Sequence, residues 1–256
     1  MQMAEITNCS LATDKRREPA SWVPKDISLQ NRLVGMLPPF ERALLLDHGE
    51  LIELKVRQKL TTAGEKSDYA YFPIDSFISV VLDLEGVPKM EVASIGNEGM
   101  FNTASVLGAP ISTFSAQVQG AGRAIRIHRH AFYLRRTEDA LLRNVLFRYI
   151  YVLTSNLAQR SVCMNYHTVE QRFARTLLVS RDHANTRELF LTHEALAFMT
   201  GTRRESISHA ASTFQKHGWI SYNRGYILLL DEAALALASC SCYATDKTVY
   251  EHIMNR

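Results

Sequence analysis

Side chains that could read nucleic-acid bases are concentrated in one short stretch of the sequence. Two helical patterns, over residues 192–200 and 203–216, are separated by Gly201, which suits a tight turn between helices. Thr192 and Thr202 are candidate N-caps of the two helices. The pattern therefore predicts a helix-turn-helix. The first turns of its second helix carry outward side chains that can all form hydrogen bonds: Arg203, Arg204, Glu205, Ser208 and His209.

These side chains have the chemistry that base recognition requires. An Arg can bridge O6 and N7 of guanine, a Glu can accept a hydrogen bond from N4 of cytosine, and a recognition helix reads bases with its N-terminal residues. A solvated helix face is also polar, so these residues alone leave both interpretations open.

The following segment favours the DNA interpretation. Residues 218–230 predict a β hairpin that turns at Asn223-Arg224-Gly225, with Gly supplying a positive φ. A hairpin directly after a helix-turn-helix is a wing. Arg224 at its tip would contact a phosphate, which positions the protein without specifying sequence.

The rest of the chain must position this motif. Residues 50–130 alternate apolar and polar positions between frequent Gly and Pro, the rhythm of an antiparallel barrel or double-sheet roll. Residues 133–165 contain no Gly or Pro and predict one long helix. The sequence therefore predicts an α+β chain with four parts: a mobile arm over 1–28, an antiparallel β-roll (jelly-roll) sensory domain over 29–132, a dimerisation helix over 133–165, and a winged-helix domain with a C-terminal tail over 166–256.

The predicted long helix has two apolar faces, which require two partners. One face can pack on the β domain, and the other suits a second copy of the same helix. The alternative is a helix buried wholly within one chain. We expect a homodimer whose interface has the 3-4 spacing of Leu142, Val145, Tyr149, Val152 and Asn156.

Composition excludes several classes of protein. The 256 residues carry a net charge of +3, and no apolar run approaches the roughly 20 residues of a membrane helix. The N-terminus does not resemble a secretory signal, so we expect the cytoplasm. Nucleophile-elbow, P-loop, dinucleotide and His-Glu-x-x-His motifs are absent from the sequence, which predicts that the protein is not an enzyme. The middle of the chain is basic, with eight arginines and two acidic residues between Arg123 and Arg160.

The cysteines give no clear signal in the sequence. Only Cys240 and Cys242 lie close together, and a Cys-x-Cys pair could chelate a soft metal. Without a second ligand pair we interpret both as reduced thiols and predict no metal and no cofactor. His128, His130 and His167 could ligate a haem, although solvated histidines explain them as well.

The order of these parts resembles the Crp/Fnr family of bacterial transcription regulators. The resemblance covers about residues 30–235 and is most specific over Thr192–Asp231. It implies a cyclic-nucleotide-binding-like β roll, a dimerisation helix, a winged helix that binds an operator, and RNA polymerase as a partner. In the family a recognition-helix Glu is followed by a Ser-Arg or Gly-Arg pair. Glu205 and Ser208 match that pattern, but His209 stands where the family has Arg.

The sensory part departs further from the family. Members that bind cyclic AMP hold its phosphate with an Arg-Ser pair that follows a Gly-Glu motif. Gly96–Met100 resembles the Gly-Glu region, but Phe114 stands where the Arg would be, and no arginine lies between Arg57 and Arg123. We expect no cyclic-nucleotide binding, and the effector is left unassigned. Cys9 stands alone near the N-terminus, so the cysteine cluster of oxygen-sensing members is missing there. The alternative function is an interaction module that acts mainly through protein partners.

Overall fold

The computed structural model describes residues 23, 25–86, 89–109 and 111–255. The predicted arm over 1–28 lies almost wholly outside these residues. Its described end is ordered structure, because Val23 is buried in the core and Lys25–Ser28 forms helix α1. Two further helices lead into the β domain: α2 (Arg32–Gly35) and α3 (Pro39–Leu46).

Asn31 fixes these entry helices to the sheet. Its side chain accepts a hydrogen bond from the Val34 amide at 3.0 Å, as the N-cap of α2. The same side-chain amide donates to the carbonyls of Pro73 at 2.8 Å and Gly99 at 2.9 Å. A fully buried side chain thus satisfies three backbone groups from separate parts of the chain.

The β domain consists of two antiparallel sheets. In the sequence, helix α4 (Thr103–Leu107) interrupts the series of strands. One sheet has the order β1-β7-β3, with bounds Gly49–Leu54, Gly122–His128 and Tyr69–Pro73. The other has the order β2-β6-β4-β5, with bounds Lys59–Thr61, Ser115–Gly120, Phe77–Leu82 and Met90–Ile95. The predicted antiparallel double-sheet roll is confirmed.

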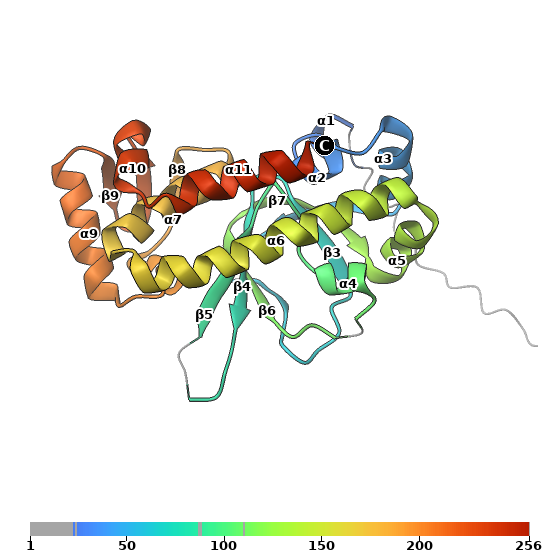
Figure 1. Ribbon diagram of the computed structural model, residues 1–256, viewed down its shortest axis with the longest axis horizontal. Coiled ribbons are helices and arrows are strands. Elements are labelled where there is room, and N and C mark those ends of the chain that lie inside the picture. Colours follow the sequence, from blue (N-terminus) through green and yellow to red (C-terminus); the bar gives the residue numbers. More distant parts are fainter. Residues whose placement is uncertain (1–22, 24, 87–88, 110, 256) are drawn as a thin grey trace, which may run out of the picture.

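The helix predicted over 133–165 is two helices, α5 (Arg129–Glu138) and α6 (Ala140–Tyr166). Asp139 between them has extended backbone, and its carboxylate accepts a hydrogen bond from the Leu142 amide at 2.9 Å. An Asp N-cap satisfies a free amide of the next helix, so it can start a helix without a Gly or Pro break. Helix α6 crosses the front of the molecule along its long axis (Figure 1).

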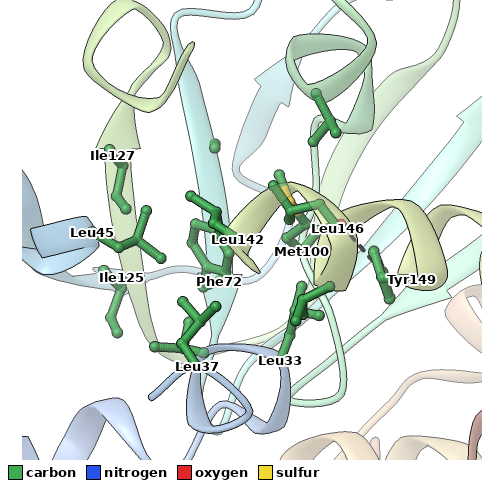
Figure 2. Packing of buried hydrophobic residues seen from close by; sticks show 14 of the residues in the cluster. Leu33, Leu37, Leu45, Phe72, Met100, Ile125, Ile127, Leu142, Leu146 and Tyr149 are labelled. Atoms are coloured by element: carbon green, nitrogen blue, oxygen red, sulfur yellow. Dashed lines mark hydrogen bonds between the residues drawn. The ribbon is translucent and has the colours of Figure 1, made fainter. Parts of the chain in front are cut away.

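The predicted dimer stripe on this helix is wrong, because four of its members are core residues. Leu142, Val145, Tyr149 and Val152 are all at most 6% exposed and pack in the same cluster as the entry helices and the β roll. Leu142 and Leu146 lie against Phe72 and Met100 (Figure 2). The fifth member, Asn156, is half-buried and lines a cavity described below. These side chains are therefore not available to a second copy.

The C-terminal part begins at a capping box, as the sequence predicts. Thr168 Oγ1 accepts from the Gln171 amide at 3.3 Å, and Gln171 Oε1 accepts from the Thr168 amide at 3.0 Å. The C-terminal part also contains a three-stranded sheet of order β8-β10-β9, whose strands lie between the helices in the sequence. The elements in chain order are α7 (Val169–Ala184), β8 (Glu188–Phe190), α8 (His193–Thr200), α9 (Arg204–Lys216), β9 (Ile220–Asn223), β10 (Tyr226–Leu229), α10 (Glu232–Ala238) and α11 (Cys242–Met254).

The last helix returns to the β domain. Helix α11 runs alongside α6 (Figure 1). Near its end, the Tyr250 hydroxyl donates to the Glu98 carbonyl at 2.8 Å, and Met254 joins the core cluster of the roll. The sequence predicts only a tail here, so this packing of the C-terminus across the whole molecule is a finding of the structure. Among the described residues, no helix combines the length and apolar character that a bilayer crossing needs.

Candidate nucleic-acid interface

The turn between α8 and α9 depends on Gly201. Its φ is +61°, and a Cβ at this position would collide with the Met164 side chain of α6. Gly is favoured here by the positive φ, since the Met164 Cε that a Cβ would meet is the end of a flexible side chain. Thr192 caps α8 as predicted, whereas the N-cap of α9 is Arg203 and not Thr202. The Thr202 amide belongs to the preceding turn, donating to the Ala197 carbonyl at 3.0 Å, and the Arg203 carbonyl accepts from the Ile207 amide at 3.3 Å as the first bond of α9.

Helix α9 buries one face and exposes the other. Its inner residues are Ile207, Ala210, Ala211 and Phe214, each at most 3% exposed. Arg203, Arg204, Glu205 and His209 are exposed, and Glu205 and His209 lie beside the start of α7. Within the described chain, Arg203 and Arg204 form no ion pair. The structure thus brings four of the five predicted helix residues to one surface.

Ser208 is the exception. It is half-buried, and its hydroxyl lies 2.8 Å from His193 Nδ1 at the start of α8. His193 in turn stacks on Tyr222 of β9, with ring centroids 4.4 Å apart and planes at 17°. Burial and the nearby charge of Arg204 lower the pKa of His193 from its ordinary 6.5. Ser208, His193 and Tyr222 therefore join α9, α8 and the hairpin into one unit.

The predicted wing is present and is a tight two-residue hairpin. Asn223 pairs with Tyr226, so the turn consists of Arg224 with φ +49° and Gly225 with φ +92°. Positive φ at both positions defines the type I′ turn, which matches the twist of the flanking strands. Arg224 is exposed at the tip and, like Arg203 and Arg204, makes no ion pair with any described residue.

Buried charges attach this unit to the rest of the molecule. Arg160 of α6 donates through Nη2 to the Met199 carbonyl at 2.5 Å, and Arg172 of α7 donates to the Thr200 carbonyl at 2.9 Å. Both carbonyls lie at the C-terminus of α8, where cations are favoured by the helix dipole. Arg160 also lies 3.3 Å from the Glu91 carboxylate of β5, which accepts a hydrogen bond from Ser79. The sequence could not indicate this link, because its partners are far apart in the chain.

A cavity of about 280 Å³ lies beside this link, between the β domain, α6, α7 and α11. Polar residues, among them Asn97, Asn156, Asp182 and Lys247, line it together with apolar ones. The Gly-Glu counterpart of the family's nucleotide pocket lies close by, but its groups bind the protein itself. Both Glu98 oxygens accept from the Gly96 amide at 3.0 and 3.1 Å, and Oε2 lies 3.2 Å from His183 of α7.

The histidines considered as haem ligands do not converge. His128 and His130 lie at the junction of β7 and α5. His167 lies beyond the far end of α6, which at 27 residues is about 40 Å long. Cys240 and Cys242 are free thiols, as interpreted from the sequence, and Cys163 and His167 lie close to them, which the sequence does not reveal.

Comparison with known proteins agrees with this architecture. Residues 171–238 match the model of the Crp-like helix-turn-helix domain. FixK2 from Bradyrhizobium japonicum superposes with a TM-score of 0.63 at 13% identity, covering 75% of this chain and 98% of that one. TTHB099, a CRP-family transcriptional regulator from Thermus thermophilus, gives 0.62 at 17% identity, with 73% and 96% covered. A putative Crp/Fnr-family regulator from Eubacterium rectale gives 0.61 at 16% identity, with 82% and 98% covered. A comparison with curated proteins found no match.

The fold and the helix-turn-helix domain agree with one class of known proteins. The chain has the α+β architecture of the Crp/Fnr regulators, and its C-terminal part carries a Crp-like helix-turn-helix domain. Both the fold and the Crp-like helix-turn-helix domain are those that the resemblance in the sequence predicts.

Proposed function

We propose that this protein is a dimeric, sequence-specific DNA-binding regulator of transcription that acts in the cytoplasm together with RNA polymerase. The observation that carries the proposal is the set of exposed guanidinium groups of Arg203, Arg204 and Arg224 on a helix-turn-helix and its wing, which form no ion pair with any described residue. In this proposal the β roll over about 29–132 is a sensory domain, and residues 166–256 form the DNA-binding domain.

The division of work between helix and wing follows from their positions. Arg204 and Glu205 lie on the first turn of α9, which enters the major groove in helix-turn-helix proteins. His209 is exposed one turn further on, so it can reach a base that the family reads with Arg. Ser208 acts indirectly, since its hydroxyl is engaged by His193. Arg224 contacts a phosphate.

A second copy of the chain fits the outward face of α6. The exposed positions repeat with alternating steps of three and four residues, the spacing of a coiled-coil seam. Phe147 and Tyr151 lie on it and are 47% and 60% exposed, although both are large and apolar. We call this set the α6 seam. Its members are Asn144, Phe147, Tyr151, Thr154, Ala158, Ser161 and Asn165.

We further propose that the nucleotide pocket is degenerate. Phe114 replaces the phosphate-binding Arg of the family, and Glu98 is engaged by Gly96 and His183. The alternative function, an interaction module that does not read DNA, is less favoured, because such a module has no need of exposed Arg side chains on the first turn of α9 and at the wing tip.

An electrophoretic mobility assay with genomic fragments, followed by sequencing of the bound pool, tests the proposal. We expect a two-fold symmetric consensus with half-sites about one helical turn apart. A bound pool without any enriched sequence would contradict specific DNA binding and favour the interaction module.

Arg204→Ala and Glu205→Ala are expected to relax preference at one or two positions of each half-site. A bidentate base contact is worth about 1–3 kcal/mol of discrimination, so scrambled DNA should bind as before while operator binding weakens. Dissociation constants for operator and scrambled DNA measure this difference. Equal losses on both DNAs, with unchanged circular dichroism, would refute direct readout by α9.

Arg224→Ala is expected to weaken binding to operator and scrambled DNA alike. Loss of one phosphate contact per chain should reduce the slope of log K against log salt by about one unit per contact, hence about two per dimer. Lys247→Ala, which removes a positive charge from α11 outside the proposed interface, is the control and should leave the slope unchanged. A loss confined to operator DNA would mean that Arg224 reads a base.

Cyclic AMP is expected not to change the thermal stability of the protein. A ligand selective for the folded state at about 100 times its Kd adds about 2.7 kcal/mol, which would raise Tm by several degrees. Scanning calorimetry with and without the nucleotide makes the comparison. A saturable rise in Tm would overturn the degenerate pocket, and Lys59, Lys66 and Lys89 would then be tested as phosphate ligands.

A further inference from the structure

Three cysteines and a histidine converge where α6 ends and α11 begins. Cys163 lies in the last turn of α6, and His167 follows four residues later as its C-cap, so both lie on the same side of the helix. Cys240 and Cys242 flank the start of α11. The three Sγ atoms and a ring nitrogen of His167 all lie within 4.8 Å of one another.

The cluster is buried and is separate from the rest of the core. Cys163, Cys240 and Cys242 are 1%, 3% and 4% exposed, and together they form a cluster to which no aliphatic or aromatic side chain belongs among the described residues. Ordinary buried cysteines pack among aliphatic side chains as small apolar groups. Here the sulfur atoms face one another instead.

We propose that Cys163, His167, Cys240 and Cys242 bind one Zn²⁺ ion. In tetrahedral zinc sites the Zn–S bond is about 2.3 Å, which places neighbouring sulfurs about 3.8 Å apart. The Cys163 and Cys240 sulfurs are 3.6 Å apart, and Cys242 Sγ is 3.6 Å from His167 Nδ1. These two separations are those of a tetrahedral site, the others are at most 4.8 Å, and a Cys₃His set is one of the usual structural zinc combinations.

The same distances disfavour other occupants. An iron–sulfur cluster places several iron and sulfide atoms between its cysteines, which therefore lie further apart than they do here. Hard cations such as Mg²⁺ and Ca²⁺ require oxygen ligands, and this set contains none. A Cys163–Cys240 disulfide would need a separation of about 2.05 Å, and the three cysteines are free thiols.

The bonding balances in charge and protons. Zinc binding forms three Zn–S bonds and one Zn–N bond and releases the three thiol protons to solvent, with no change of oxidation state. Three thiolates and Zn²⁺ leave one negative charge. Arg175 and Arg160, each paired with a carboxylate, both lie within electrostatic range of Cys163 and attract the thiolate.

All four ligands come from the protein, so the site leaves no open coordination position for catalysis. Its role is structural: the bound ion would cross-link the end of α6 to the start of α11. The Gln159 side chain already joins the two helices there, donating to the Cys242 carbonyl at 2.8 Å and to Asp246 at 2.9 Å. Because α7 and the helix-turn-helix follow directly after His167, zinc would fix the direction in which the C-terminal domain leaves α6.

Metal analysis of the purified full-length protein tests this proposal. We expect about one Zn²⁺ per chain, falling below about 0.1 in Cys163→Ser, Cys240→Ser and Cys242→Ser. Cys9→Ser, which changes the other cysteine of the sequence, is the control and should retain the full content. Anaerobic replacement of zinc by Co²⁺ should give thiolate charge-transfer absorption and the intense visible bands of a tetrahedral site.

A second measurement covers variants that fail to fold. In the unmodified protein, three thiols should resist alkylation until a chelator is added, and the chelator should lower Tm. The proposal is overturned if the reduced, folded protein binds neither Zn²⁺ nor Co²⁺, or if Cys240→Ser retains full stoichiometry. It is also overturned if excess Zn²⁺ leaves Cys163 and Cys240 joined as a disulfide in the purified protein.

Discussion

Tyr151→Glu is expected to convert the protein from a dimer to a monomer and to lower operator affinity about 10²–10⁴-fold, the gain that linking two binding modules provides. Tyr151 lies near the middle of the α6 seam and is 60% exposed in the single chain. In a symmetric pair of helices, a Glu at this position would place two uncompensated negative charges in the interface. Sedimentation velocity and operator titration measure the two effects.

The control for this experiment is Phe40→Glu. Phe40 of α3 is 70% exposed. Its substitution by Glu replaces an aromatic side chain by an acidic one, as Tyr151→Glu does, but at a position away from α6. It should leave both the dimer and DNA binding intact. If the unmodified protein sediments as a monomer at micromolar concentration even on operator DNA, the α6 seam is not a dimer interface.

The helix-turn-helix could be predicted because its signals are local. Thr192 as a cap, Gly201 as a turn and the Arg224-Gly225 hairpin each lie within a few residues of the structure they determine. The α9 start is displaced by one residue, since the carbonyl of Arg203 and not that of Thr202 accepts the first bond of the helix, from the Ile207 amide. Such a shift depends on one hydrogen bond, which composition does not reveal.

The face of α6 that packs inward could not be predicted in the same way. Leu142 and Tyr149 on one side, and Phe147 and Tyr151 on another, are equally apolar in the sequence. The choice is made by packing against Phe72 and Met100, which lie more than 40 residues away in the chain. For the same reason the cysteine cluster was missed, because Cys163 and Cys240 are 77 positions apart.

The prediction with the largest effect on stability concerns Glu91, the buried carboxylate beneath α8. Glu91→Ala is expected to lower the free energy of unfolding by about 3–5 kcal/mol, the usual cost of removing one member of a buried ion pair. The Glu91 side chain is 2% exposed and that of Arg160 is 14% exposed, so the guanidinium would stay buried without its carboxylate. Denaturant unfolding followed by circular dichroism measures the change.

Two further variants separate the lost ion pair from other causes. Glu53→Ala removes an exposed carboxylate from β1 and should change stability by no more than about 0.5 kcal/mol. Glu91→Gln keeps the size and a hydrogen-bond acceptor, so it should cost less than Ala. Equal stability of Glu91→Ala and the unmodified protein would show that Arg160 holds the Met199 carbonyl without help from β5.

The pH dependence of stability gives an independent check on Glu91. Burial raises the pKa of its carboxyl from the ordinary 4.5, against the opposing effects of Arg160 and Ser79. A raised folded-state pKa means that the group favours folding most below pH 4.5 and loses that contribution as pH rises through the raised value. As pH rises through the raised pKa, the free energy of unfolding of the unmodified protein should therefore fall relative to that of Glu91→Gln, because Gln does not titrate. A difference that stays constant with pH would mean that ionisation of Glu91 costs the folded state nothing, and that Arg160 compensates its burial in full.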